Sequence, residues 1–186
     1  MKVPPGTTLI RLFRGGIRSI HMAQLVIPIL VASGLLITGI APAYAEALKW
    51  KLTYHLVKAE ISEVGDVPGH TLGHTRASGI AFFDNGEVAT VSLSFTLDYV
   101  NGAGQHDGYL VYAFEDGSTF VMKIQGSTTP DPGSKTSSFK GKFSFTQGSG
   151  RFSGITGSGG YAGRRLAPTP AAGAELFADF SGTYSR

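Results

Sequence analysis

The sequence contains no cysteine, and only 16% of its residues are charged. Without cysteine the fold has no disulfide to stabilise it, and thiol catalysis is excluded. After residue 45 the basic residues stand apart, except for the adjacent pair Arg164-Arg165. The pattern of aromatic and basic residues that is typical of an RNA-binding sheet is also missing. We therefore expect no nucleic-acid partner.

The first 45 residues have the order of a secretory signal, in which basic residues precede an apolar run and a cleavage site with small side chains. The run Leu25–Ile40 is almost purely apolar, and Ala43-Tyr44-Ala45 has the small side chains that a signal peptidase reads. This order predicts cleavage before Glu46, export to the periplasm or the cell exterior, and no stable membrane insertion afterwards. An uncleaved anchor is one alternative, although the run is shorter than the roughly 20 residues of a spanning helix. An internal start at Met22 is another.

Residues 46–186 remain after this cleavage, and their length suits one domain. The signal peptide, residues 1–45, carries four basic and no acidic side chains, so its loss changes the formal charge from +3 to −1. The remaining segment is rich in glycine and lacks the apolar spacing of helices. Its composition predicts an all-β domain with many turns.

Alternation of apolar and polar residues predicts strands throughout this domain, most clearly over 48–56 and 91–99. Between two such runs lies Asp84-Asn85-Gly86, and because Asn-Gly tolerates positive φ angles it predicts a hairpin with a type I′ turn. Asp116-Gly117 predicts a second hairpin. We count about eight strands and predict a closed or nearly closed antiparallel barrel, because closure leaves no exposed strand edge.

One predicted strand, 109–114, is apolar on both faces, and it follows a polar, glycine-rich break at 101–108. Such a strand is covered on both sides, in a sandwich, a filled barrel or a subunit interface. Its two faces carry Tyr109, Val111 and Ala113, and Leu110, Tyr112 and Phe114. This strand supports the hypothesis of a protein-interaction module that uses the apolar barrel surface, or of a homo-oligomer.

The stretch GSGRFSGITGSGG, residues 148–160, is the most glycine-rich part of the chain. A phosphate-binding loop requires a helix after the glycines, and no helical pattern follows here. Glycines in a sheet also allow bulges and positive φ angles where the sheet bends. We therefore predict a bend in which Phe152 and Ile155 enter the core while Arg151 stays at the rim.

The same stretch resembles the late strands of the allene oxide cyclase-like barrels, a group that includes plant dirigent proteins and small secreted bacterial proteins. In that group a pattern of the type G-[ST]-G-x-F-x-G-x-x-G joins two barrel strands. The resemblance extends roughly over Gly108–Tyr184. The residues that match the pattern are Gly148, Gly150, Phe152, Gly154 and Gly157.

This resemblance implies an eight-stranded barrel with an apolar cavity, often assembled as a trimer. It also implies two kinds of activity, cyclisation of a fatty-acid-derived epoxide or steering of radical phenol coupling. No local motif places the catalytic residues of either branch on this chain.

The histidines offer few candidates for chemistry. On a strand, His70 and His74 lie roughly 13 Å apart, which is too far for one metal ion. The dipeptide His106-Asp107 is flanked by glycines and reads as a polar turn. We expect no metal site and no cofactor.

The aromatic residues outnumber those that a solidly filled barrel of this size needs, so some of them line a cavity or an interface, with plain core packing as the alternative. The leading hypothesis is an exported barrel that binds a small apolar or aromatic molecule in its lumen, with an isomerase or cyclase as the enzymatic alternative. A homodimer or homotrimer is the expected assembly. The candidate lumen residues are Trp50, Tyr54, Phe95, Tyr99, Tyr109, Tyr112 and Arg151.

Overall fold

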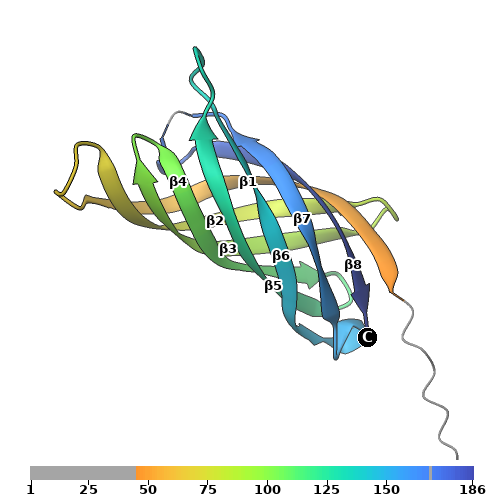
Figure 1. The fold of residues 1–186 in the computed structure, drawn as a ribbon. Coiled ribbons are helices and arrows are strands. Elements are labelled where there is room, and N and C mark those ends of the chain that lie inside the picture. Colours follow the sequence, from red (N-terminus) through yellow and green to blue (C-terminus); the bar gives the residue numbers. More distant parts are fainter. Residues whose placement is uncertain (1–44, 168) are drawn as a thin grey trace, which may run out of the picture. The chain divides into compact units, whose positions relative to one another are not determined.

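A computed structural model describes residues 45–167 and 169–186. Eight antiparallel strands close into a barrel in chain order, with the last strand paired to the first (Figure 1). The prediction of a closed, all-β, eight-stranded barrel is therefore confirmed. Apart from Ala45, the predicted signal peptide lies outside the described residues. No helix in the described part of the chain is long and apolar enough to span a membrane.

The strands take up most of the described chain, and a single 3₁₀ turn, η1 (Gly150–Phe152), lies between the sixth and seventh strands. Their bounds are β1 (Glu46–Glu63), β2 (His70–Phe83), β3 (Val88–Val100), β4 (Ala103–Phe114), β5 (Thr119–Pro130), β6 (Ser137–Ser149), β7 (Thr156–Arg165) and β8 (Glu175–Ser185).

Because each strand is antiparallel to the next, the connections fall at two ends of the barrel. The turn end contains both chain ends of the barrel and lies beside the label C in Figure 1. Its connections are 84–87, 115–118 and 150–155. The opposite end, which we call the loop end, contains the connections 64–69, 101–102, 131–136 and 166–174.

The hairpin predicted at Asp84-Asn85-Gly86 is present, but its turn is not of type I′. Only Gly86 among these residues has a positive φ, 88°, and its N–H donates to the carbonyl of Phe83 over 2.9 Å. Positive φ at both central residues occurs instead at Asn101 and Gly102, with 52° and 79°. That tight turn joins β3 to β4 where the sequence indicated a longer break, so β4 starts earlier than predicted.

Strict alternation along the strands fills the half of the lumen near the turn end with aromatic rings. At its centre Trp50 stacks on Phe180 with 5.0 Å between ring centroids, and its indole N–H donates to the hydroxyl of Tyr112 over 3.0 Å. Tyr112 in turn stacks on Phe120 at 4.5 Å. We call this part of the core the aromatic half; its rings are Trp50, Phe83, Tyr112, Phe114, Phe120, Phe143, Phe145, Phe152 and Phe180, the last of which also borders the loop-end half.

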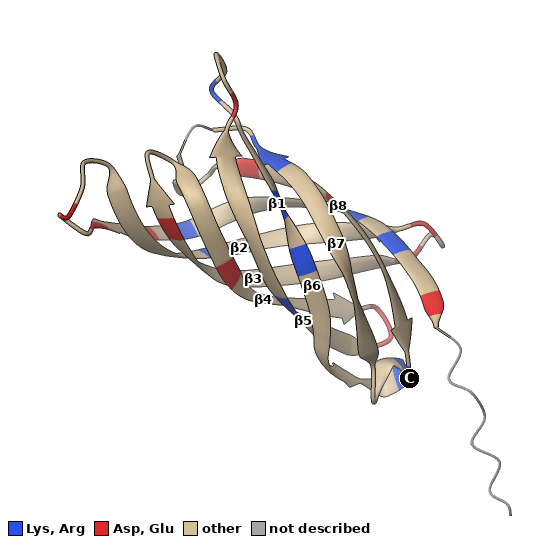
Figure 2. Ribbon diagram, in the orientation of Figure 1, with Lys and Arg blue, Asp and Glu red and all other residues tan. Residues whose placement is uncertain are grey.

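Acidic and basic residues are interspersed along the strands and connections (Figure 2). Several form exposed ion pairs, such as Lys51 with Asp179 at 2.5 Å and Lys58 with Glu60 at 2.6 Å. Exposed pairs of this kind stabilise a fold by at most about 1 kcal/mol each. Stability therefore comes mainly from the packed lumen.

Candidate functional site

The glycine-rich stretch bends the chain at the turn end, as predicted. Phe152 and Ile155 are buried, and the positive φ angles of Gly150 and Gly154 allow the tight path between β6 and β7. Arg151 lies outside the lumen, which corrects its placement among the lumen candidates. Its guanidinium pairs with the Glu87 carboxylate at 2.5 Å and covers the Phe114 ring at 4.7 Å, so acidic residues of the neighbouring turn hold it at the rim.

Tyr109 is the second candidate that the structure places elsewhere. It is 49% exposed, because the alternation of β4 turns Leu110 and Tyr112 inward and Tyr109 outward. Trp50 and Tyr112 do lie inside the barrel, but they belong to the aromatic half and do not border a cavity. These two residues pack the core.

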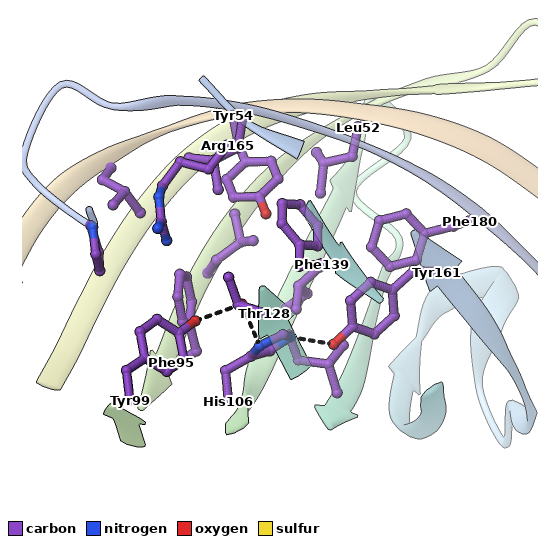
Figure 3. A pocket seen from close by; sticks show the side chains of 16 residues that line it. Leu52, Tyr54, Phe95, Tyr99, His106, Thr128, Phe139, Tyr161, Arg165 and Phe180 are labelled. Carbon is purple, nitrogen blue, oxygen red and sulfur yellow. Dashed lines mark hydrogen bonds between the residues drawn. The ribbon is translucent and has the colours of Figure 1, made fainter. Parts of the chain in front are cut away.

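A cavity of about 30 Å³ lies in the loop-end half of the lumen (Figure 3). Tyr54, Phe95 and Tyr99 line it, as the sequence predicted. The volume is close to that of one water molecule. The other lining residues are Leu52, Leu56, Leu93, His106, Leu110, Ile124, Thr128, Phe139, Tyr161, Arg165, Pro170, Leu176 and Phe180.

A chain of polar side chains crosses the wall of this cavity (Figure 3). His106 Nε2 lies 2.7 Å from the Tyr161 hydroxyl, and His106 Nδ1 lies 3.2 Å from Thr128 Oγ1. Thr128 Oγ1 is also 2.7 Å from the Tyr99 hydroxyl. Four strands, β3, β4, β5 and β7, thus supply one connected network, which we call the polar chain.

The polar chain shows that the sequence interpretation of His106-Asp107 as a turn was wrong. Both residues belong to β4, where His106 points into the lumen and Asp107 points outward to accept a hydrogen bond from Thr96. The neighbouring Gly108 suggested a turn, but it serves close packing in the sheet. A Cβ there would collide with the backbone and side chain of Phe95 on β3.

Two inward-facing glycines make room for the contact between His106 and Tyr161. A Cβ on Gly126 would lie 2.5 Å from the Tyr161 hydroxyl and 2.9 Å from His106 Nε2. A Cβ on Gly141 would also collide with the Tyr161 hydroxyl. Any side chain at either position would therefore displace the Tyr161 ring, so the missing side chains are part of the site.

Burial sets the charges in the cavity. It lowers the pKa of His106 to about 4, helped by the nearby Arg165 and opposed by Asp107, so the imidazole is neutral at pH 7. Burial raises the pKa of the Tyr161 hydroxyl, which also stays neutral. Arg165 contributes the one permanent charge among the lining residues. It donates to Ser137 Oγ and to the carbonyl of Ala167, each at 3.0 Å.

Tyr54 differs from the polar chain, because no described residue hydrogen-bonds its hydroxyl. The residue is only 8% exposed, and burial raises the pKa of its hydroxyl well above the ordinary value. The hydroxyl points into the cavity (Figure 3). Over the described residues no fully buried side-chain nitrogen or oxygen lacks a hydrogen-bond partner, so the Tyr54 hydroxyl keeps some contact with solvent.

The two histidines on β2 lie apart from this site. His70 Nδ1 is 2.6 Å from Asp66 and its Nε2 is 2.9 Å from Asp98, so the ring joins the connection 64–69 to β3. His74 Nε2 lies 2.9 Å from the Ser94 hydroxyl. Over the described residues, no group of three metal-binding side chains comes together.

Comparison with known proteins adds little to this geometry. No family model matches the chain, and no curated protein matches it. A similar solved structure is that of RPA1785, a conserved protein of unknown function from Rhodopseudomonas palustris. It is 12% identical, with a TM-score of 0.45 over 75% of this chain and 97% of that chain. A likeness this distant carries no functional conclusion.

Proposed function

We propose that the protein is an exported barrel that binds a small apolar or aromatic molecule in the loop-end half of its lumen. The observation that carries this proposal is the cavity, which is lined mostly by aliphatic and aromatic side chains and into which the Tyr54 hydroxyl points. No hydrogen bond joins that hydroxyl to another described residue, so it is available to a bound molecule.

The cavity lining has the composition of a small-molecule site. Most of its side chains are aliphatic or aromatic, and a few convergent polar groups stand among them. Sites for drug-sized ligands enclose roughly 300 to 1,000 Å³, whereas this cavity has about 30 Å³. A ligand must therefore displace side chains as it enters. Phe95 and Pro170, which are only half-buried, are the lining residues with the most freedom to move.

The order of the first 45 residues supports export, and the barrel supports the resemblance to the allene oxide cyclase-like group. The glycine pattern from Gly148 to Gly157 joins β6 to β7, and the resemblance implies that this pattern joins two barrel strands. Membership of that group is part of the proposal. It is consistent with an apolar ligand in the lumen.

Native mass spectrometry of the protein purified from its own host tests the proposal directly. We expect a small mass that stays with the folded protein and disappears from the denatured spectrum. Bare protein in both spectra, together with no shift in melting temperature across a panel of small aromatic compounds, would contradict lumen binding.

A matched pair of substitutions on β8 assigns the retained mass to the cavity. Leu176 lines the cavity, whereas its neighbour Phe177 is 41% exposed on the outer face. Leu176→Phe fills the space and should abolish retention of the ligand, while Phe177→Leu should leave it intact. Retention by both variants would place the ligand elsewhere.

A second candidate function, contact with another copy of the chain, is favoured by exposed apolar side chains on the outer face. Thr53 of β1 is flanked by Phe177 on β8 and Ile80 on β2. Six apolar side chains of β2, β3, β4 and β8 are exposed on this face, with hydroxyl side chains such as Thr53 between them: Ile80, Phe82, Val88, Tyr109, Val111 and Phe177. Light scattering after size-exclusion chromatography tests this proposal. Phe82→Lys should convert a dimer or trimer to a monomer, and a monomeric wild-type protein would contradict it.

A further inference from the structure

The outer face of three neighbouring strands carries charge of one sign. β5, β6 and β7 contain five charged residues, and all five are lysine or arginine (Figure 2). Arg165 is buried, whereas the other four lie on the outer face, and we call them the basic row: Lys123, Lys142, Lys140 and Arg164. Residues 46–186 as a whole contain slightly more acidic than basic side chains, so this face differs from the rest of the barrel.

The basic row runs diagonally across the three strands with even spacing. On β6, Lys140 and Lys142 stand two residues apart on the same face, which separates them by roughly 7 Å. Lys123 of β5 lies diagonally from Lys142, because its direct partner on β6 is Ser144. Arg164 of β7 lies diagonally from Lys140 in the same way, and such neighbours are roughly 7 to 8 Å apart. This spacing suits a chain of negative charges better than a single small anion, which needs cations that converge on one point.

The three lysines of the basic row form no ion pair with any described residue. Acidic side chains on the flanking strands have other partners. Asp107 of β4 accepts a hydrogen bond from Thr96 over 2.9 Å, and Asp179 of β8 pairs with a lysine of β1. Arg164 pairs with Asp131 at 3.3 Å but remains half-exposed. Most of the positive charge of the row is therefore available to a partner.

A hollow of about 650 Å³ lies on the outer face at the middle of the basic row. Gly126, Gly141 and Gly160 line it with bare backbone, which lets a bound chain approach the sheet closely. Lys140 and Lys142 also line the hollow. Three further lining residues have side chains that can hydrogen-bond hydroxyl groups: Gln105, Gln125 and Ser127. The hollow thus combines two ammonium groups with amide and hydroxyl groups.

We infer that this face binds an acidic polysaccharide, whose repeated charges pair with the basic row while its hydroxyl groups form hydrogen bonds in the hollow. A lipid surface or a second copy of the chain fits less well, because β5, β6 and β7, which the structure describes in full, expose no large apolar side chain. Single-stranded nucleic acid would need exposed rings on which to stack its bases. The inference goes beyond the proposed function, since this face lies outside the lumen.

Polygalacturonate and its fully methyl-esterified form test the inference, because they share one sugar backbone and differ in charge. Isothermal titration calorimetry with the purified protein measures both dissociation constants. At low salt the acidic polymer should bind at least about tenfold more tightly than the ester, and added salt should reduce the difference by screening the charges. Equal affinities, or no binding of polygalacturonate, would overturn the inference. Binding to phosphatidylglycerol vesicles in place of the polymer would identify a membrane-docking face instead.

A matched pair of double substitutions assigns the binding to this face. Lys140→Gln with Lys142→Gln should weaken the binding of polygalacturonate about tenfold. Lys49→Gln with Lys58→Gln removes the same charge from exposed positions of β1 and should leave the affinity unchanged. All four side chains are exposed, so the melting temperature should stay close to the wild-type value in both variants. Equal losses of affinity would show that net charge alone attracts the polymer, and would overturn the inference.

The hollow is tested by adding a side chain to it. A Cβ on Gly160 would meet only one atom, 3.5 Å away, so Gly160→Leu should fold and fill part of the hollow. Ser158→Leu adds a leucine to the same strand, outside the hollow. We expect the first variant to bind polygalacturonate about fivefold more weakly and the second to bind it normally. Wild-type affinity in both would contradict the inference. Retention of a small mass in the lumen should be the same in both variants, which separates this inference from the proposed function.

Discussion

The two halves of the lumen are built from the same strands but differ in what they contain. In the aromatic half the rings pack closely, and the indole N–H of Trp50 reaches the hydroxyl of Tyr112. In the loop-end half there are a neutral imidazole, a buried guanidinium, a cavity and the hydroxyl of Tyr54. The first half is organised for stability. The second is less tightly packed and has several polar groups that face one cavity.

The difference between the two halves appears in the inward-facing residues of three consecutive strands, β4, β5 and β6. On β4 the inward residues change from His106 and Gly108 near the loop end to Leu110, Tyr112 and Phe114 near the turn end. On β5 they change from Thr128 and Gly126 to Ile124, Met122 and Phe120, and on β6 Gly141 gives way to Phe143 and Phe145. Apart from Phe139 on β6, these loop-end positions hold small or polar residues and leave the space that large residues fill at the turn end.

Truncation in the aromatic half should have the largest effect. Trp50 is 1% exposed and contacts rings on several strands, so Trp50→Ala should lower the free energy of unfolding by about 3 to 5 kcal/mol. Equilibrium denaturation measures this. Phe177→Ala, at an exposed aromatic residue, is the control and should change the value by about 0.5 kcal/mol or less. A loss below about 1 kcal/mol at Trp50 would show that this half is not the source of stability.

Acid should destabilise the loop-end half through His106. Its pKa is about 4 in the folded protein and about 6.5 in an unfolded chain. Between these values the unfolded chain binds a proton that the folded protein does not, so stability falls as the pH falls from about 6.5 to about 4. The expected loss is on the order of 3 kcal/mol.

Denaturation curves at several pH values check this expectation. His106→Gln should remove that part of the pH dependence, whereas His55→Gln, at an exposed histidine of β1, should retain it. If the His106 variant and the wild-type protein lose stability in parallel, the imidazole is not held neutral by burial.

Much of the fold could be predicted because the signal is local. Trp50 and Tyr54 alternate with Lys51 and Thr53, which is enough to assign the inner face of β1. The type of turn was harder to predict from the sequence. Asn-Gly occurs both at 85–86 and at 101–102, but only the second pair has positive φ at both residues, as a type I′ turn requires. Which turn forms depends on the register of the paired strands.

The site could be predicted only in part. Tyr54 and Tyr99 were identified from their place on inner faces, but His106 was missed because its partners Thr128 and Tyr161 lie 22 and 55 residues away. Strand register, which brings these residues together, is not encoded within one segment. Arg165 could have been predicted as a lumen residue, because it lies four residues after Tyr161 and residues at this spacing share one face of a strand.

A side chain added beside the Tyr161 hydroxyl should cause an intermediate loss of stability. A Cβ on Gly141 would collide with the Tyr161 hydroxyl, so Gly141→Ala should cost about 1 to 3 kcal/mol and displace the ring from His106. A Cβ on Gly160 would meet only one atom, 3.5 Å away, which makes Gly160→Ala a matched control. Thermal denaturation and the histidine NMR signals of both variants measure the two effects. Equal stabilities and equal histidine signals in the two variants would show that the side chains around Tyr161 rearrange to accept the added methyl group.

The smallest expected change in the free energy of unfolding is at Tyr54, and it is best measured against Tyr112, the corresponding buried tyrosine of the aromatic half. Tyr112→Phe leaves the indole N–H of Trp50 without its acceptor, so it should cost about 1 to 3 kcal/mol. Tyr54→Phe removes a hydroxyl that no described residue binds, so unfolding without ligand should be unchanged or slightly less favourable, with a change of about 0.5 kcal/mol or less. Similar losses in both variants would mean that Tyr54 is already satisfied in the free protein. A loss at Tyr112 alone would leave ligand binding as the reason for keeping the Tyr54 hydroxyl inside the barrel.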